Sequence, residues 1–362
     1  MLDTPDHSDI LARDKALTLA ALAATSWCAR GSAAVPTGGT LVERAMLAAS
    51  WASRARRSYG LPALSPADLL ACLEQPVSDW LPDGGAFNLV EGGQPTPICQ
   101  DLADDAGTSP LAEIEQRIIR DVMRHLLGRA DGAAAYTAFR RFLVEHAHAE
   151  SSAAAAAAQS VGVEFAQVYS HIAPAAVIAR GKQSEFYPCP RCRWPMHVHG
   201  TLVSCHRSET CLAAGARFDL SEASLVGLGA LPPPSPVLAQ GKAALRPGIW
   251  RFTVLPGLEE LDLERRLAAI DGATVMLWPF VDAYDLDVRR GEARWRIDVK
   301  DHSSAVSLAR HLNDRQVTET TWIVVPDRRE AQIPVLERLV ARDAGYRFAS
   351  SSEIVRRVKE AA

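Results

Sequence analysis

Two alternating segments near the C-terminal end, residues 281–288 and 295–300, constrain the fold more than any other feature of the sequence. Successive side chains of a strand point to opposite faces, so the alternation predicts a β-hairpin with two chemically different faces. The segments are joined at Gly291-Glu292. If these residues form a two-residue turn, the pairing places Asp285 directly opposite Asp298.

The two faces of this hairpin differ in chemistry. One face carries the charged side chains of Asp285, Asp287, Asp298 and Lys300. The opposite face is apolar and suits a protein core, with Tyr284, Leu286, Val288, Trp295, Ile297 and Val299. Carboxylates that face each other across a hairpin repel unless a positive charge lies between them. A divalent cation fits that place.

The ligand types on the charged face indicate which cation to expect. Carboxylate oxygens without sulfur or imidazole favour Mg²⁺ or Mn²⁺, and such ions catalyse hydrolysis by activating water and neutralising a phosphoryl group. Lys300 reaches the same place and can orient or deprotonate the attacking water. The 39 basic residues include only five lysines, namely Lys15, Lys182, Lys242, Lys300 and Lys359. A lysine here therefore indicates a chemical requirement, although a surface strand end can also carry one.

These residues resemble the PD-(D/E)XK, or restriction-endonuclease-like, nucleases. The core of that family runs helix, three-stranded meander, helix, strand, and residues 249–362 can be laid out in the same order. The expected elements are a helix at 258–267, a strand at 273–280, the hairpin, a helix at 303–312, a strand at 320–325, a helix at 333–342, a strand at 346–349 and a helix at 351–359. The resemblance implies an α/β nuclease domain with a mixed sheet.

The resemblance also implies roles for individual residues. It assigns Asp285 and Asp298 to a catalytic Mg²⁺ or Mn²⁺ ion, with the Val299 carbonyl as a third ligand. It assigns Lys300 to the attacking water. Many relatives add an acidic residue from the first helix, and either of two residues fits that role, Glu264 or Glu260.

One part of the family pattern is missing. The usual Pro-Asp pair is absent, because Ala283-Tyr284 precedes Asp285. The choice between Asp285 and Asp287 as a metal ligand therefore stays open, and Asp285 is favoured because it lies opposite Asp298. The alternative to a metal site is a solvated acidic hairpin on an ordinary α/β domain.

Four cysteines upstream have the spacing of a metal site. Cys189 and Cys192 lie in a Cys-Pro-Arg-Cys knuckle, twelve residues precede Cys205, and five more precede Cys211. This arrangement predicts a Zn²⁺ ion held by four thiolates, and closed coordination of this kind is structural rather than catalytic. The segment 194–204 predicts the hairpin of a zinc ribbon.

The cysteine spacing has alternatives too. The four residues can also form disulfides or stay as free buried thiols. Spare ligands are present should one cysteine not bind, namely His197, His199 and His206.

The predicted ribbon is basic. Residues 180–217 contain Lys182 and five arginines against Glu185 and Glu209, with aromatic residues between them. Basic charge and stackable rings suit a nucleic-acid backbone. Zinc ribbons also serve as structural staples or protein-docking modules, so both roles stay open.

Composition indicates a globular protein. With 362 residues, of which 48% are hydrophobic and 23% charged, the chain is long enough for two or three domains. No run of 18 apolar residues predicts a membrane span, and residues 1–9 do not resemble a secretory signal. The cysteines outside the ribbon are scattered, which favours reduced thiols in the cytoplasm.

Charge and helical periodicity suggest how the chain is divided. Residues 1–179 hold 20 acidic and 13 basic side chains and predict an acidic helical region for protein docking. A zinc ribbon at 180–226 and a Pro-rich linker at 227–248 follow, and residues 249–362 form the nuclease-like domain. The expected fold class is thus α+β with several domains. Within the first region, helices are expected at 10–25, 41–58, 111–127 and 136–149, with a long loop at 82–110.

The arrangement as a whole resembles the restriction-endonuclease-like proteins encoded beside prokaryotic PIWI-type (pPIWI-RE) proteins. That resemblance implies a role in defence against plasmids or phage. It also implies DNA as substrate and a complex with a PIWI-like protein and a DinG-type helicase.

Three hypotheses about function compete. The first is an Mg²⁺-dependent DNA endonuclease subunit whose partners supply target choice. The second is a free-standing restriction or repair nuclease that reads its site through the ribbon. The third is a non-catalytic zinc-ribbon adaptor with an inactive nuclease-like domain. Intact Asp285, Asp298 and Lys300 argue against the third, and the acidic first half favours the first over the second. A homodimer is possible, since cutting both strands with one active site per chain commonly needs a pair.

Overall fold

The computed structural model describes residues 7–29, 41–105, 110–205, 208–221, 224–315 and 317–361. The chain is α+β, as expected, and divides into two compact units. The first unit comprises residues up to 109 with 207–209 and 302–309, and the second comprises the rest. None of the helices in the described ranges is long and apolar enough to cross a membrane.

The first unit is a small helical unit whose core is rich in alanine. Its elements are α1 (His7–Cys28), α2 (Leu41–Arg57), α3 (Pro66–Cys72), α4 (Val77–Trp80), β1 (Val90–Glu91), β2 (Gln94–Pro95) and α5 (Pro97–Asp105). Ala16 and Ala20 of α1 and Ala48 and Ala52 of α2 are fully buried in one cluster. Because the distance between packed helices depends on the side chains at the contact, this alanine stripe allows α1 and α2 to pack closely.

Local signals predicted part of this unit. Helices are present where periodicity placed α1 and α2, and Ser65 caps α3 by accepting a hydrogen bond from the Asp68 N–H at 3.1 Å. The loop predicted at 82–110 is wrong in part, because it contains the β1–β2 hairpin and α5. Cys99 and Leu102 of α5 are buried. This packing against distant residues stabilises a helix that the local Gly and Pro content does not predict.

The second unit begins with a layer of helices, α6 (Pro110–Leu126), α7 (Gly132–Glu145), α8 (Ser151–Ser160) and α9 (Phe165–Val168). The structure therefore divides the predicted helical region 1–179, since residues from 110 onward cluster with the C-terminal half. Buried side chains of α6 and α7, among them Val122 and Leu143, share one core with the C-terminal sheet. An amphipathic pattern shows that a helix has an apolar face, but not which distant element covers it.

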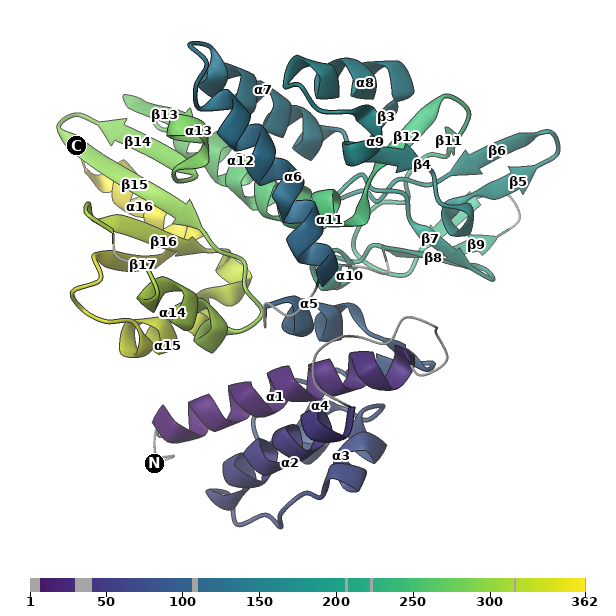
Figure 1. Cartoon of the computed structure of the whole chain (residues 1–362), viewed down its shortest axis with the longest axis vertical. Helices are drawn as coiled ribbons and strands as arrows, with labels where there is room; N and C mark the ends of the chain where they lie inside the picture. The colour runs from purple at the N-terminus through teal and green to yellow at the C-terminus, as the bar shows by residue number, and fades with distance from the viewer. Residues whose placement is uncertain are drawn as a thin grey trace. The chain divides into compact units, whose positions relative to one another are not determined.

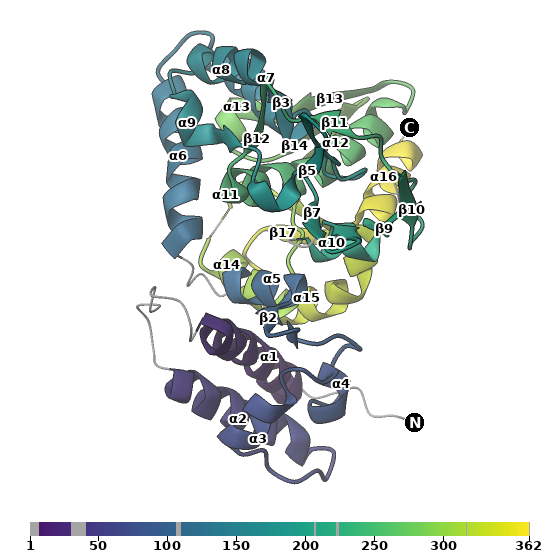
Figure 2. The same ribbon diagram turned by 90° about the vertical axis from the view of Figure 1, so that its right-hand side faces the viewer.

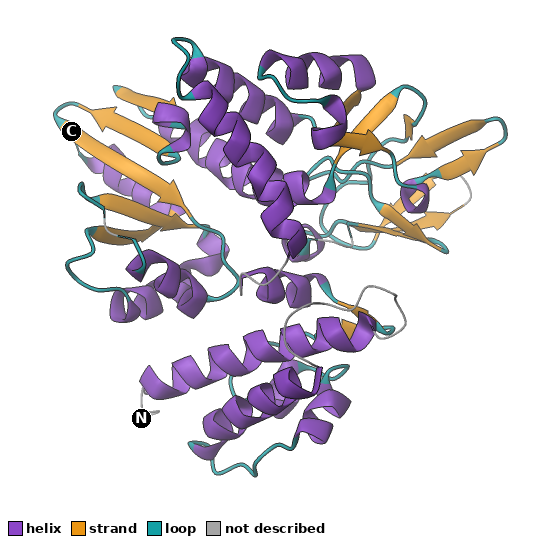
Figure 3. Cartoon of the chain, viewed as in Figure 1, coloured by secondary structure: helices purple, strands orange, loops and turns teal. Residues whose placement is uncertain are grey.

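Short strands form three small antiparallel sheets in this unit. They are β3 (His148–Glu150), β12 (Lys242–Leu245) and β4 (Tyr169–His171); β5 (Ile178–Arg180), β6 (Gln183–Phe186) and β11 (Val237–Leu238); and β7 (His197–His199), β8 (Leu202–Ser204), β9 (Arg217–Ser221) and β10 (Ser224–Gly227). Figure 3 shows these short strands on the other side of the helical layer from the longer C-terminal strands.

Residues 227–248, predicted as a Pro-rich linker, contain the strands β11 and β12 of these sheets. Strand β11 pairs with β6, and β12 lies between β3 and β4. Ala243 and Leu245 of β12 are buried. The partners of these strands lie far away in the sequence, which is why the segment has no periodicity of its own.

A continuous helical run leads from the small sheets to the C-terminal sheet. It starts with α11 (Pro247–Ile249), widens into a π-helical turn at Trp250–Val254, and continues as α12 (Leu255–Ala268). In the wide turn, the Leu255 N–H donates to the Trp250 carbonyl, five residues earlier. Proline at position 256 has no N–H to donate, so the backbone there cannot keep the regular pattern.

The C-terminal part forms a five-stranded sheet whose strands lie side by side in chain order (Figure 1). They are β13 (Ala273–Leu277), β14 (Leu286–Arg290), β15 (Ala293–Val299), β16 (Thr321–Val325) and β17 (Tyr346–Ser350). The first three form an antiparallel meander, and β16 and β17 extend it in parallel with β15. Parallel neighbours require a crossover, which α14 (Ala305–Asn313) and α15 (Ile333–Leu339) provide.

The first and last helices of this part of the chain, α12 and α16 (Ser351–Glu360), are in contact. Helix α16 follows β17 and contacts both α12 and the sheet. Ser350 caps α16 through a hydrogen bond from the Glu353 N–H. On the other side of α12 lies α7, and Figures 1 and 2 show α7 next to α12 and to the short helix before β14.

The predicted register of the β14–β15 hairpin is confirmed. Arg290 pairs with Ala293, so Gly291-Glu292 is a two-residue turn, and Gly291 has φ +56°. A positive φ at the first turn position is what such a hairpin requires, and glycine adopts it without strain. Leu286 pairs with Ile297, so the next residues outward, Asp285 and Asp298, face each other.

The contact between α7 and α12 generates a stability prediction. An ideal Cβ at Gly257 would lie 2.4 Å from Val144 Cγ2, and Val144 is buried. We expect Gly257→Ala to destabilise the protein by about 1–3 kcal/mol through overpacking, which outweighs the gain of about 1 kcal/mol in helix propensity. Urea unfolding measures this change.

The control is Gly128→Ala, because a Cβ there meets no atom within 4 Å. Combining Gly257→Ala with Val144→Ala should recover part of the loss by removing the clashing methyl groups. A Gly257→Ala variant as stable as the wild type would contradict the close packing of these helices.

Candidate active site

Asp285 and Asp298 meet at the open end of the β14–β15 hairpin. Asp285 is 6% exposed, and its Oδ2 accepts a hydrogen bond from the Val299 N–H at 2.6 Å. Burial, together with the charges of Glu260 and Asp298, raises the pKa of Asp285 well above its ordinary value. Two carboxylates that face each other in a buried place share one proton unless a cation lies between them.

Lys300 supplies one positive charge to this pair. Its Nζ lies 2.5 Å from Asp298 Oδ1, and both side chains are about a quarter exposed. Burial alone would raise the pKa of Asp298, but the charge of Lys300 and a hydrogen bond from Asp285 outweigh it and lower that pKa. Burial disfavours the Lys300 ammonium, yet Asp298 and Asp285 hold the pKa of Lys300 above its ordinary value.

Glu260 of α12, not Glu264, is the helix carboxylate that lies near the pair. Glu260 is 2% exposed, and its charge contributes to the raised pKa of Asp285. The alternative one turn further along, Glu264, instead forms an ion pair with Arg141 at 3.1 Å. Of the two predicted alternatives, Glu260 therefore lies beside the aspartate pair, and its role at the metal stays a prediction. Helical spacing places both residues on one side of α12 and does not distinguish them.

Asp287 has other partners and does not join the pair. Its carboxylate lies 2.6 Å from Arg294 Nη2 and accepts a hydrogen bond from the Tyr284 hydroxyl at 2.7 Å. Arg289 is a second ion-pair partner at 3.5 Å. Asp287 shares its strand face with Asp285, but the register places it opposite Arg296 rather than Asp298.

Glu260 is held by two donors that sequence reasoning missed. Arg140 Nη2 of α7 donates to both Glu260 oxygens at 2.8 Å, and Trp278 Nε1 donates to Oε2 at 2.5 Å. Arg140 Nη1 also forms an ion pair with Asp282. A signal for Arg140 was present, because it shares a helix face with Tyr136, Phe139 and Leu143, all buried. A charged residue on an apolar helix face has to find a buried partner.

A left-handed turn connects β13 to the hairpin. After β13, the backbone enters the short helix α13 (Pro279–Asp282), in which Phe280, Val281 and Asp282 have φ between +55° and +66°. Trp278, just before it, has φ +49°. Non-glycine residues in this region are strained, and such strain persists only where surrounding contacts hold it. The predicted strand 273–280 therefore ends at Leu277.

Six side chains make up what we call the acidic cluster. They are Arg140, Glu260, Asp282, Asp285, Asp298 and Lys300. Four carboxylates against two cations leave two negative charges when all are ionised, which is the charge that one divalent cation neutralises. The exposed Arg315 adds a positive field at Asp298.

The oxygen ligands of this cluster suit Mg²⁺ in kind. In the part of the chain that the structure describes, only the four cysteines bring three or more ligand atoms within 4.8 Å of one another. The acidic cluster thus offers a closely facing pair, Asp285 and Asp298, rather than a closed cage. Mg²⁺ is usually held by one or two carboxylates and completes its shell with water and substrate phosphate.

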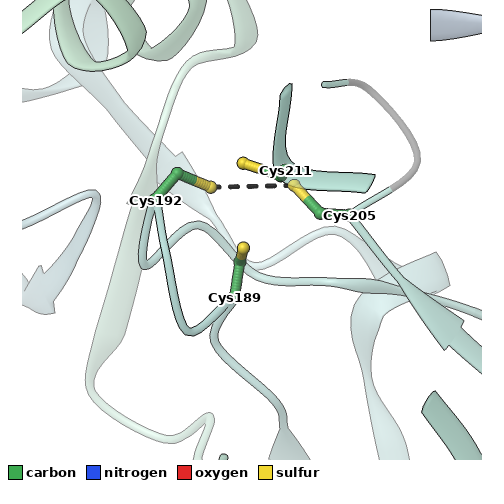
Figure 4. Close-up of side chains that lie close together, drawn as sticks. All are labelled: Cys189, Cys192, Cys205 and Cys211. Atoms are coloured by element: carbon green, nitrogen blue, oxygen red, sulfur yellow. Dashed lines mark hydrogen bonds between the residues drawn. The ribbon is translucent and has the colours of Figure 1, made fainter. Parts of the chain in front are cut away.

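The cysteines converge as their spacing predicted (Figure 4). Cys189, Cys192, Cys205 and Cys211 are all buried. Cys192 Sγ lies 3.7 Å from Cys205 Sγ, and all seven cysteines of the chain are free thiols. A tetrahedral ion with metal–sulfur distances of about 2.3 Å separates its sulfur ligands by about 3.8 Å. The geometry therefore fits a metal ion such as zinc and does not fit disulfides.

The elements around the cysteines form the predicted hairpin. Strands β7 and β8 pair between the knuckle and Cys205, and Cys211 lies in α10 (Glu209–Ala213). The spare ligands His197 and His199 lie on β7 outside the sulfur group, and His206 lies outside the described residues.

Arg191 links the cysteine group to α12. Its Nη1 donates to Cys211 Sγ at 3.7 Å, and its Nη2 lies 2.6 Å from Glu259. Glu259 also pairs with Arg328 at 2.8 Å, and Arg328 forms an ion pair with Asp301. A chain of charges therefore runs from the cysteine group to the residue after Lys300. One arginine of the basic ribbon thus has an intramolecular partner.

Comparison with known proteins identifies two regions of the chain. Residues 257–362 match a family model described as REase associating with pPIWI_RE, and residues 42–149 match one described as pPIWI_RE three-gene island domain Y. No curated protein and no solved structure matches the chain. The first match contains all of the acidic cluster except Arg140, which lies in the second. The two matches, a REase region that follows a domain Y region, support a restriction-endonuclease-like identity of the pPIWI_RE island type.

Proposed function

We propose that the protein is a DNA endonuclease subunit of PD-(D/E)XK type that depends on Mg²⁺ or Mn²⁺. The observation that carries the proposal is the hairpin register, which sets Asp285 opposite Asp298 with Lys300 two residues further on. The topology of the C-terminal sheet supports it, since a helix and an antiparallel meander precede strands added in parallel. The match to a REase family supports the same reading.

Each residue of the site has a distinct task in this proposal. Asp285 and Asp298 hold the cation, each through the oxygen that Val299 N–H or Lys300 leaves free. The Val299 carbonyl stays a predicted third ligand. When bound, a divalent cation lowers the pKa of a water molecule and neutralises charge on the phosphoryl group. Lys300 directs its donors to the same place, where it orients the attacking water. Glu260 adds a third negative charge behind the pair.

The partners belong to the proposal as well. The names of both matched families refer to pPIWI_RE, and one refers to a three-gene island. We propose that the chain acts with a PIWI-like protein and a DinG-type helicase, which supply target choice, in defence against foreign DNA. A pair of chains would allow both strands to be cut.

We further propose that the cysteine group binds a structural zinc ion. Four buried sulfur atoms at the spacing of a tetrahedral ion support it, as does the N–H that Arg191 directs at Cys211. All four positions are filled by protein, so none is open for a substrate. Glu259 of α12 forms ion pairs with both Arg191 and Arg328, so the ribbon also stabilises the position of α12 and of the end of β15.

The active-site assignment makes a direct prediction. Asp298→Asn and Lys300→Ala should each reduce Mg²⁺-dependent nicking of plasmid DNA by about a hundredfold or more, because each removes a group that stabilises charge at the reacting phosphate. Asp287→Asn is the matched control and should cleave like the wild type. Cleavage is measured for the chain alone and together with its island partners.

Undiminished cleavage by both active-site variants would exclude this site. If only Asp287→Asn loses cleavage, the metal ligand on this strand is Asp287 and not Asp285. A wild-type protein that is inactive alone and with its partners would favour the non-catalytic adaptor.

The zinc proposal is tested by elemental analysis. Wild-type protein should contain about one zinc per chain, and Cys205→Ser should lose it and unfold at lower temperature, because binding energy at such a site is folding energy. The control is Cys72→Ser, which changes a half-buried thiol outside the group. Well-folded wild-type protein with no zinc would contradict the proposal.

A further inference from the structure

Arg140 reaches the acidic cluster from a part of the chain that lies far from it in sequence. It belongs to α7, within the residues that match domain Y, whereas the other five members of the cluster lie within the REase match. Helix α7 packs beside α12 and α13 (Figure 1), and its arginine contacts one residue from each of these helices, Glu260 and Asp282. Arg140, one of the two cations of the acidic cluster, thus comes from outside the REase match.

The contacts of Arg140 require a guanidinium. One nitrogen donates to both oxygens of Glu260 at 2.8 Å, and another pairs with Asp282. The guanidinium also stacks on the Trp278 ring at 4.7 Å from its centroid. Arginine is 8% exposed here and Glu260 2%. A lysine ammonium is a compact point charge without the planar fork of arginine, so it cannot reproduce this set of contacts.

These contacts hold two elements that flank Asp285. Glu260 fixes α12, and Asp282 ends the left-handed turn that leads into the hairpin. The backbone N–H of Trp278, at the start of that turn, donates to the backbone carbonyl of Asp285 at 2.7 Å. Tyr136, also on α7, adds a hydrogen bond from its hydroxyl to Asp282 at 2.9 Å. Arg140 therefore contacts both ends of the left-handed turn before Asp285, Trp278 through its ring and Asp282 through an ion pair.

The same contacts restrict how Glu260 can act. Its Oε2 accepts from both Arg140 and Trp278, so the two lone pairs of that oxygen are used. Oε1 accepts from Arg140 alone and keeps one lone pair. Glu260 can thus present a single oxygen toward the cluster, in a rotamer that its two donors determine.

We propose that Arg140 is a positioning residue of the metal site, which holds Glu260 and the turn before Asp285 in the arrangement that binds a divalent cation. This inference rests on the proposed function, because it assumes that Asp285 and Asp298 bind the ion. It makes cation binding depend on α7, so this helix and residues 257–362 act as one functional unit. Removing a partner that orients metal ligands typically costs about 10- to 100-fold in metal affinity.

The test is calorimetric titration of the full-length, zinc-loaded chain with Mn²⁺, which does not depend on cleavage. Arg140→Lys keeps a positive charge in the cluster, whereas Arg140→Met would leave two buried carboxylates without compensation. We expect Arg140→Lys to weaken Mn²⁺ binding about tenfold or more while the protein stays folded. The matched control is Arg141→Lys, since the next residue pairs with Glu264 at the surface, and it should bind like the wild type.

A double-mutant comparison separates positioning from a general loss of structure. If Arg140 acts through Glu260, then Arg140→Lys should weaken binding less in a Glu260→Gln background than in the wild type. A merely structural effect would add the same loss in both backgrounds. Melting temperature and zinc content are recorded for every variant to verify the fold.

Three results decide the matter. Wild-type affinity in folded Arg140→Lys overturns the role of Arg140 and leaves the proposed function standing. Equal Mn²⁺ binding by the wild type and Asp298→Asn overturns the metal site itself, and the proposed function with it. If Arg140→Lys fails to fold, Tyr136→Phe takes its place, because it removes a donor to Asp282 without removing a charge. A Tyr136→Phe protein that binds Mn²⁺ like the wild type then overturns the inference.

Discussion

The C-terminal half of this protein depends on one electrostatic constraint, the meeting of two aspartates across a hairpin. The turn at Gly291 and the apolar rear face set a register that places Asp285 against Asp298. That register cannot slip by one residue without moving the apolar face out of the core. The carboxylates are therefore held together although they repel, and the surrounding structure supplies positive charge. Lys300 provides one part of it, and we propose that a divalent cation provides the rest.

The second source of positive charge links α7 to the C-terminal part of the chain. Arg140 comes from α7 and meets Glu260 and Asp282, both of them close to the hairpin. A buried ion pair contributes little net stability by itself, because desolvation offsets its attraction. Its value lies in specifying one arrangement of α7, α12 and the left-handed turn, which the close contact at Gly257 also enforces. Stability, the position of Asp285 and the charge of the cluster thus depend on the same few contacts.

Local patterns in the sequence were sufficient for the features that depend on neighbouring residues. Side-chain parity and a two-residue turn predicted the pairing of Asp285 with Asp298, and cysteine spacing predicted the sulfur group. What failed depended on distant contacts. Parts of the segment 227–248 pair with strands far away in the sequence. Glu260 differs from Glu264 in its burial and in its partners, Arg140 and Trp278 instead of Arg141. Periodicity identifies a face but not its partner.

Anomalous diffraction from crystals of the full-length chain soaked in Mn²⁺ tests the central claim most directly. The account predicts a strong anomalous peak between the carboxylates of Asp285 and Asp298, with metal–oxygen distances of about 2.0–2.3 Å, Lys300 beside it and Arg140 still bound to Glu260. An absence of Mn²⁺ at this pair in well-diffracting crystals, or a peak held by Asp287 instead, would contradict it.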